Sequence, residues 1–277
     1  MSAVEKVDLT NCDREPIHIP GSIQCHGCLI ACDPQGGAVR RHSSNAAEML
    51  KLPDDIIGRD LGELLGEAAA SRIREALARG SEPSSPALLF GVPVKSGERF
   101  DVAVHVFKGA GIVEFEPASA EDGPALDLAR SMFARVRGEK DVDKLLEHST
   151  RLVRSVLGYD RVMIYRFSDD GAGQVVSEDK REDLESFLHQ WFPASDIPQQ
   201  ARSLYLRNII RVIGDARGTR CELVPDERLL EEEPLDLSFS HLRSVSPIHL
   251  EYLRNMGVAA SMSISVIVDG QVWGLVA

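Results

Sequence analysis

The sequence predicts an α+β fold made of two domains, with antiparallel sheets and flanking helices. Its 277 residues are enough for two domains of ordinary size. In the first part, the predicted order is one strand, several short helices and three further strands. The second part is predicted to begin with helices and to end in a hairpin. A hydrophobic content of 43% with 27% charged residues is typical of a globular chain.

The N-terminal segment is expected to form an extended arm over its first twenty residues. Pro16 and Pro20 favour extended backbone in the residues that precede them. The apolar run 27–33 then leads into a turn of the sequence Pro34-Gln-Gly-Gly, which predicts a strand that enters a hairpin.

Helices and then strands are predicted along the rest of the first domain. The expected helices are Ser43–Leu50, Asp60–Leu65 and Ala68–Ala78. Ser44 is the predicted cap of the first of them, because a hydroxyl can accept from a free backbone N–H group. The expected strands are 86–93, 99–107 and 111–116, with turns at 95–97 and 109–111.

The second domain follows a change of composition at 118–124, which we interpret as a linker. Helices are expected at Ala125–Val136 and Val142–Leu157, and Gly158 ends the second of them. One face of this second helix is apolar and consists of Val142, Leu145, Leu146, Leu152, Val153 and Val156.

The strands of the second domain are predicted at 161–167, Met262–Val268 and Val272–Ala277. The Asp269-Gly270 pair between the last two runs indicates a tight hairpin. We expect the final strand to lie in the middle of its sheet. Because no covering helix follows it, we also expect the chain to be cut from a longer protein.

The chain is acidic, with a formal net charge of −12 and an isoelectric point of about 5.2. That charge argues against sequence-independent nucleic-acid binding and against docking on an anionic membrane. The N-terminus has no apolar signal region, and no run approaches the roughly 18 apolar residues of a membrane helix. We therefore expect a cytoplasmic protein in which the cysteines are thiols. They are Cys12, Cys25, Cys28, Cys32 and Cys221.

The cluster Cys25-His26-Gly27-Cys28, followed by Cys32, allows two interpretations. A zinc or iron–sulfur site would use such residues, but a closed structural site needs four ligands, and Cys221 stands alone in the sequence. A redox pair is also disfavoured, because its motif should open a helix. The favoured interpretation is that Cys28 and Cys32 are small apolar residues of a strand.

The segment Pro193-Ala-Ser-Asp-Ile-Pro198 encloses an acid between two prolines that restrict the backbone. This arrangement suits an aspartate that must point in a definite direction. The alternative is a simple turn before a helix at Gln199–Tyr205, with Ser195 or Asp196 as its cap.

A third group of residues surrounds a helix that is expected to begin at Pro247. His249, Tyr252 and Met256 share one face of this helix, where a lone histidine is usually a satisfied core residue. Two arginines, a tyrosine and two serines could together bind carboxylates: Arg211, Arg243, Tyr205, Ser261 and Ser263. No catalytic serine–histidine–acid spacing and no phosphate loop occurs in the sequence.

Taken together, these segments resemble the bacteriophytochromes, the biliverdin-binding phytochromes of bacteria. The run from Cys12 to Gln24 is similar to the N-terminal arm of that family. Four further segments resemble the motifs of its GAF domain: Asp160–Phe167, Pro193–Pro198, Ser246–His249 and Trp273–Leu275. The resemblance covers nearly the whole chain. It implies an arm at 1–20, a PAS domain at 21–117, the linker at 118–124 and an incomplete GAF domain at 125–277.

The resemblance also implies how biliverdin is held. Cys12 matches the cysteine that forms a thioether with the A-ring vinyl group. Asp196 matches the aspartate whose main-chain carbonyl faces the pyrrole N–H groups, and His249 matches the histidine that hydrogen-bonds the pyrrole water and ring nitrogens. Ile23 matches the residue at the family's figure-of-eight knot, in which the arm threads a GAF loop.

Further residues complete the implied cofactor site. Arg211, Arg243 and Tyr205 match the residues that hold one propionate of the bilin in this family. Ser261 and Ser263 match those that hold the other propionate. The aromatic wall around the D ring is Tyr165, Phe192 and Tyr252. Ser246 and Ile197 belong to the matching motifs and are included in the predicted site.

The sequence departs from the family at three places. Cys25 stands where a proline is usual and is a second candidate for attachment, and Gln190 and Trp191 replace the usual residues before the Pro193–Pro198 motif. The family also continues past Ala277 with a histidine that contacts the D ring, a closing helix and a PHY domain. Plant and cyanobacterial phytochromes carry the attaching cysteine where this chain has Ile248, which favours biliverdin over phycocyanobilin.

The resemblance implies a red/far-red photoreceptor module that signals through D-ring isomerisation. We expect no catalysis from the chain itself, although the parent protein could be a sensor histidine kinase of a two-component system. A homodimer through the GAF helices and an output domain or response regulator are the implied partners. The alternatives are a PAS–GAF regulatory module for another small ligand and a metal or redox protein built on the cysteine cluster.

Overall fold

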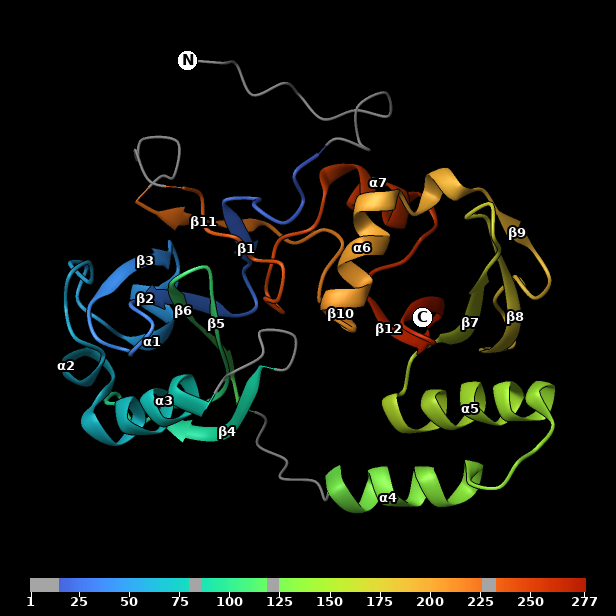
Figure 1. Cartoon of the computed structure of the whole chain (residues 1–277), viewed down its shortest axis with the longest axis horizontal. Helices are drawn as coiled ribbons and strands as arrows, with labels where there is room; N and C mark the ends of the chain where they lie inside the picture. Colours follow the sequence, from blue (N-terminus) through green and yellow to red (C-terminus); the bar gives the residue numbers. More distant parts are fainter. Residues whose placement is uncertain (1–14, 80–85, 119–124, 226–232) are drawn as a thin grey trace. The chain divides into compact units, whose positions relative to one another are not determined.

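The computed structural model describes residues 15–79, 86–118, 125–225 and 233–277 (Figure 1). It divides into two compact units, each built from two separate stretches of the chain. The first unit consists of residues 1–119 and 212–261, and the second of residues 120–211 and 262–277. Both units contain an antiparallel sheet with helices, so the predicted α+β class is confirmed. Within the described ranges, no helix has both the length and the apolar character to cross a bilayer.

The first unit is organised around a sheet of seven strands in the order β1-β11-β3-β2-β6-β5-β4. Every pair of neighbours is antiparallel. The strands are β1 (Ser22–Gln24), β2 (Cys28–Cys32), β3 (Val39–Ser43), β4 (Ala87–Pro93), β5 (Arg99–Phe107), β6 (Ala110–Pro117) and β11 (Arg220–Val224). The hairpin after the apolar run 27–33 and the three-strand meander are therefore confirmed. The strand β11 comes from the later stretch of the chain and lies between β1 and β3.

The helices of this unit are α1 (Ala46–Leu50), α2 (Leu61–Leu65), α3 (Glu67–Arg79) and α7 (Pro247–Asn255). The predicted start of α1 was wrong, because Ser43 belongs to β3 and the cap position is Asn45. The Ser43 hydroxyl accepts from the Leu29 N–H at 2.9 Å, which ties this residue to the sheet. Helix α2 is capped by Asp60, whose carboxylate accepts from the Gly62 N–H at 2.7 Å.

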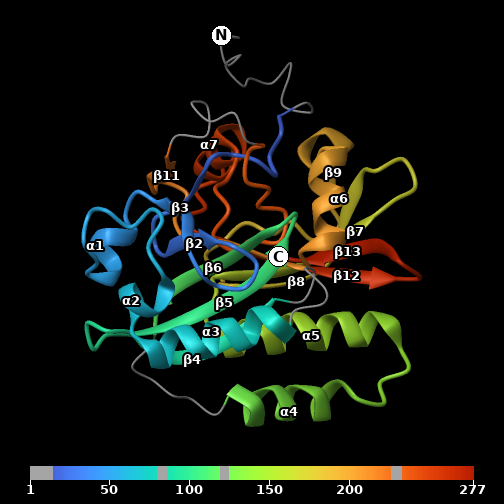
Figure 2. The same ribbon diagram turned by 60° about the vertical axis from the view of Figure 1, so that its left-hand side comes forward.

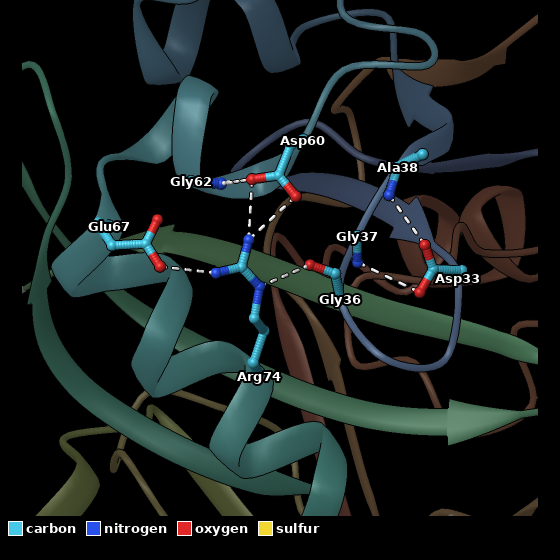
Figure 3. A network of polar contacts seen from close by, with 8 residues as sticks. All are labelled: Asp33, Gly36, Gly37, Ala38, Asp60, Gly62, Glu67 and Arg74. Atoms are coloured by element: carbon cyan, nitrogen blue, oxygen red, sulfur yellow. Dashed lines mark hydrogen bonds and ion pairs between the residues drawn. The ribbon is translucent and has the colours of Figure 1, made fainter.

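Arg74 of α3 fastens the helices to the β2–β3 hairpin (Figure 3). Its Nε donates to the Gly36 carbonyl at 3.1 Å, while its two terminal nitrogens contact Asp60 and Glu67, each at 2.8 Å. Asp33 closes the hairpin turn, because its carboxylate accepts hydrogen bonds from backbone N–H groups of the turn. One arginine therefore joins α3 to the β2–β3 hairpin and to Asp60, the cap residue of α2.

The sheet of the first unit is covered on both faces. Successive side chains of β2 point to opposite faces and are apolar on both, so each face needs a covering layer. Cys28, Ile30 and Cys32 face a core formed with α1, α2 and α3, and Figure 2 shows α3 running along β4 and β5. Leu29 and Ala31 face the opposite side, where the segment from Leu235 to Leu242 packs. This second core consists of Ile23, Leu29, Ala31, Ile112, Cys221, Leu223, Leu235, Leu237 and Leu242.

The described part of the arm is bound to the later stretch of the chain. The backbone carbonyl of His18 accepts from the Leu237 N–H at 2.7 Å, and that of Ile17 accepts from Arg243 Nη1 at 2.6 Å. Residues 17 and 18 form a turn closed by the Ile19 N–H on the Pro16 carbonyl, so the expectation of a fully extended arm was wrong here. The predicted knot needs such contacts but stays a prediction, because residues 226–232 lie outside the described ranges.

The expectation that all five cysteines are thiols was also wrong. Cys25 and Cys221 form a disulfide, with their Cα atoms 5.4 Å apart. The pairing of β1 with β11 sets Ile23 opposite Cys221 and so brings Cys25, two residues further on, within bonding reach. Cys28 and Cys32 are free and buried, as the interpretation as apolar strand residues predicts. Cys12 lies outside the described residues.

Two polar side chains of the meander are buried against the segment that follows Leu235. Glu114 accepts from the backbone N–H groups of His241 and Leu242, at 3.1 and 2.7 Å. His105 is 1% exposed, and neither ring nitrogen has a hydrogen-bond partner among the described residues. Burial, together with the charge of the nearby His241, lowers the pKa of His105 from its ordinary 6.5 to about 4.

Acidification should therefore destabilise the first unit through His105. Its pKa in the folded state is depressed, so its contribution to stability is complete above pH 6.5 and is lost as the pH falls towards 4. A shift of this size corresponds to about 3 kcal/mol of unfolding free energy. Urea unfolding at a series of pH values should show this loss, and His105→Leu should remove most of it. A variant that loses stability as steeply as the parent would contradict this role.

The second unit is organised around a sheet in the order β10-β12-β13-β7-β8-β9. Its strands are β7 (Arg161–Phe167), β8 (Gly173–Lys180), β9 (Trp191–Phe192), β10 (Ile210–Ile213), β12 (Ser261–Val268) and β13 (Gln271–Val276). The last strand lies inside the sheet, as predicted. Asp269 and Gly270 both have positive φ, at 51° and 74°, which confirms the tight hairpin.

The helices of the second unit are α4 (Ala125–Val136), α5 (Val142–Leu157) and α6 (Gln199–Arg207). Helix α5 has the predicted bounds and ends at Gly158 in the left-handed conformation. It packs on β8, where Thr150 and Ser177 share a hydrogen bond at 3.1 Å and Arg154 pairs with Asp179 at 3.1 Å.

Candidate functional site

Some of the predicted site residues belong to the second unit and the others to the first unit. The second unit contains Tyr165, Phe192, Asp196, Ile197, Tyr205, Arg211 and Ser263. The first unit contains Arg243, Ser246, His249, Tyr252 and Ser261.

An aromatic cluster forms at one end of the second unit's sheet. Tyr165 of β7 is 6% exposed, and its ring centroid lies 6.1 Å from that of Phe192 on β9. Phe167 packs edge-on against Tyr165 at 5.2 Å, and Phe187 packs edge-on against Phe192 at 6.1 Å. The structure therefore brings together two of the three residues of the predicted aromatic wall and adds two phenylalanines that sequence reasoning missed.

Gly173 is a further residue that sequence reasoning missed. It pairs with Phe167 on one side and with Phe192 on the other. A Cβ atom at this position would overlap the Tyr165 ring, so the ring can lie across the strand only because position 173 has no side chain. The sequence carries only a weak signal, which is a glycine at the start of an otherwise regular strand.

Gly173→Ala should displace the Tyr165 ring and lower the free energy of unfolding by about 1–3 kcal/mol. The same substitution in a Tyr165→Ala background should cost much less, because the clashing ring is absent. Chemical denaturation of the parent, both single variants and the double variant measures this coupling. Equal losses in the two backgrounds would show that the ring and the glycine do not interact.

The segment Pro193–Pro198 forms a short 3-10 turn at Ala194–Asp196, closed by the Asp196 N–H on the Pro193 carbonyl at 3.1 Å. The predicted cap of the next helix was wrong. Its cap position is Pro198, and no side chain caps it, so neither Ser195 nor Asp196 has that role. Asp196 and Ile197 are half-buried at the end of this turn.

The candidate carboxylate ligands of the second unit come from three elements. Tyr205 is on α6, Arg211 on β10 and Ser263 on β12. The last two strands are neighbours and are joined by the Ser265 N–H on the Ile209 carbonyl at 2.8 Å. Arg211 and Ser263 therefore lie on adjacent strands, and both are half-buried.

The candidate residues of the first unit surround helix α7, which has Pro247 in its first turn as predicted. His249 and Tyr252, three residues apart on this helix, stack with ring centroids 6.2 Å apart and planes inclined by 13°. Arg243 is 6% exposed. The Ser246 hydroxyl donates to Glu15 Oε2 at 2.5 Å, which joins the start of α7 to the arm.

The buried cysteines are poorly suited to metal binding or redox chemistry, both of which need a thiolate. Burial raises the pKa of the Cys28 thiol far above its ordinary value. Burial also raises the pKa of Cys32 to about 12, and the charge of Asp33 adds to this rise. Among the described residues, no group of three or more His, Cys, Asp or Glu side chains could hold a metal ion.

Comparison with known protein families matches both parts of the chain. Residues 12–118 match a family described as the PAS fold, and residues 141–277 match the GAF domain. A bacteriophytochrome of Pseudomonas aeruginosa is 43% identical over 99% of this chain, and cyanobacterial phytochrome B of Nostoc sp. is 38% identical over 98%. The chain spans 38% and 37% of these two relatives.

Solved structures extend the similarity to three dimensions. The chromophore-binding domain of an unusual bacteriophytochrome from R. palustris is 37% identical, with a TM-score of 0.85 over 96% of this chain and 88% of that one. The corresponding domain of a Stigmatella aurantiaca bacteriophytochrome is 39% identical, with a TM-score of 0.84 and coverage of 96% and 89%. The chain therefore belongs to the bacteriophytochrome family and comprises the PAS and GAF parts of such a photoreceptor.

Proposed function

We propose that this chain is a red/far-red photosensory module that binds biliverdin IXα covalently through Cys12. The observation that carries the proposal is the set of side chains suited to a tetrapyrrole with two carboxylates. It combines the Tyr165–Phe192 aromatic pair, the His249–Tyr252 stack, two arginines and the hydroxyl groups of Tyr205, Ser261 and Ser263. Large ligands of this kind need an apolar slot with a few polar groups, and arginine binds carboxylates with two hydrogen bonds.

Each residue has a proposed role toward the bilin. Arg211, Arg243 and Tyr205 hold one propionate, and Ser261 and Ser263 hold the other. The Asp196 carbonyl and His249 accept from the pyrrole nitrogens, because a buried cation needs hydrogen-bond partners. The bound bilin supplies the light absorption and the D-ring isomerisation.

The aromatic residues Tyr165, Phe192 and Tyr252 surround that D ring in our proposal, beside Ile197 and Ser246. Biliverdin is favoured over phycocyanobilin because position 248, where the other phytochromes attach their bilin, is an isoleucine. Cys25 can compete with Cys12 only after reduction, since its sulfur is bonded to Cys221.

The chain acts, in this proposal, as one part of a longer cytoplasmic protein. The domains are the arm at 1–20, PAS at 21–117, the linker at 118–124 and GAF at 125–277. A homodimer through the GAF helices would cover apolar side chains of α4 and α5, where Phe133 is 74% and Val142 is 61% exposed. The signal passes to an output domain or response regulator, and the parent protein could be a histidine kinase.

The attachment site is tested by incubating the chain with biliverdin and staining a denaturing gel with zinc. We expect fluorescence from the parent and from Cys25→Ser, and none from Cys12→Ser, because the thiolate is the form of cysteine that attacks a vinyl group and Cys12 matches the attachment position of the family. Both variants should still bind pigment before denaturation. Staining that persists in Cys12→Ser and disappears in Cys25→Ser would contradict the assignment.

A further inference from the structure

A partly buried ion pair lies beside the aromatic cluster of the second unit. Arg161 begins β7, and its Nη1 lies 3.0 Å from Oε1 of Glu178 on β8. The side chains are 17% and 3% exposed, unlike the half-exposed ion pairs on the surface of this unit. When an ion pair is removed from water, the cost of desolvating the two charges offsets most of their attraction, so the pair adds little net stability to the fold. Its main contribution is to hold neighbouring groups in place.

Both partners hold the segment that precedes β9. Arg161 Nη2 donates to the Glu185 carbonyl at 2.5 Å. The Glu178 carboxylate accepts from the Ser186 hydroxyl at 2.6 Å and from the Phe187 N–H at 3.1 Å. The ion pair therefore fixes three consecutive residues, 185–187, against the sheet.

The Arg161 guanidinium also lies over the Phe187 ring, with its central carbon 3.7 Å from the ring centroid. A planar guanidinium can pack its face on an aromatic ring and at the same time donate hydrogen bonds in its own plane, which the ammonium group of lysine cannot do. Phe187 in turn packs edge-on against Phe192, which contacts Tyr165. A continuous row of contacts thus runs from Glu178 through Arg161 and the two phenylalanines to Tyr165.

We propose that Arg161, held by Glu178, is a positioning residue that sets the place of the Phe187–Phe192–Tyr165 row. The inference rests on the proposed function, in which Phe192 and Tyr165 border the bilin ring that isomerises. Arg161 touches no reacting atom. It acts through Phe187, whose ring packs edge-on against Phe192, because closely packed rings pass small shifts to one another.

Arg161→Lys tests this role, because lysine keeps the charge facing Glu178 and loses both the planar stack and the forked donor set. Arg154→Lys is the matched control. Arg154 pairs with Asp179, the next residue of β8, at 3.1 Å, and it also donates to a backbone carbonyl, that of Tyr159 at 3.2 Å. It comes from α5, and among the described residues it is not one of the cations that lie over an aromatic ring.

Both lysine variants should bind biliverdin in the same amount as the parent and should melt cooperatively. Reactions in packed sites respond to displacements near 1 Å, so we expect Arg161→Lys to change the fluorescence yield and the photoconversion rate about twofold or more. Arg154→Lys should leave both unchanged. Equal spectra for all three proteins, or equal changes in the two variants, would overturn the positioning role.

A second measurement separates this inference from the proposed function. If the parent binds no bilin, the proposed function fails, but the row of contacts can still be examined in the apoprotein. Trp191 is adjacent to Phe192 and is 58% exposed. In a Trp273→Phe background, Arg161→Lys should change iodide quenching of Trp191 and Arg154→Lys should not. Unchanged quenching would overturn the inference independently of the pigment.

Discussion

Leu242→Ala is expected to lower the free energy of unfolding of the first unit by about 2–5 kcal/mol, the usual range for a buried leucine. Leu242 is fully buried in the core that also contains Ile23 and Leu29. Its side chain fills the space above Gly27, where an added Cβ would lie 2.7 Å from a Leu242 methyl group. Truncation therefore leaves a cavity that the neighbouring backbone cannot fill.

Leu88→Ala is the control variant. It removes the same atoms from a residue of the same unit, but Leu88 is 55% exposed. Urea unfolding of both variants gives the difference directly. Leu242 belongs to the later stretch of the chain, whereas Ile23 and Leu29 belong to the first. Equal midpoints for the two variants would mean that the two stretches do not fold as one unit.

Reduction of the Cys25–Cys221 disulfide is expected to lower the free energy of unfolding by about 2–5 kcal/mol. The bond closes a loop in which 196 positions separate the two cysteines, and a crosslink over such a distance strongly restricts the unfolded chain. Unfolding with and without dithiothreitol measures the effect, and thiol titration of the denatured protein should show two additional thiols after reduction.

The double variant Cys25→Ser, Cys221→Ser is the control, because it retains Cys12, Cys28 and Cys32. Dithiothreitol should leave its stability unchanged, and its midpoint should match that of the reduced parent. A variant that responds to dithiothreitol as strongly as the parent would show that the disulfide does not account for the difference.

The sequence predicted those elements whose signals are local. Helix α5, the strands of the meander and the Asp269-Gly270 turn all have periodic or turn-specific patterns in the sequence, and each of these elements is confirmed. The start of α1 was misplaced because Ser43 is held by a hydrogen bond to a strand fourteen residues earlier. Local propensity carries no information about such a partner.

Contacts over long sequence distances were beyond prediction from a single sequence. The disulfide joins positions 196 apart, and β11 inserts into a sheet otherwise formed by the first stretch of the chain. Both follow from the pairing of β1 with β11, which leaves no periodic signal.

The candidate site was predicted mainly through family resemblance. Tyr165 and Phe192 are in contact, and His249 stacks on Tyr252, but their roles toward a bilin stay predictions. Gly173 and the Arg161–Glu178 pair escaped notice, because a glycine in a strand and two charges seventeen residues apart are unremarkable until the strands pair.

The central claim is that the chain binds a bilin and responds to light, and an absorption spectrum tests it most directly. The 277-residue chain is co-expressed with a haem oxygenase, which supplies biliverdin, and purified in the dark. We expect a strong long-wavelength band that is absent from protein made without the oxygenase, together with a light-minus-dark difference spectrum. A folded protein that shows a cooperative melt but carries no long-wavelength band in the presence of biliverdin would contradict the account.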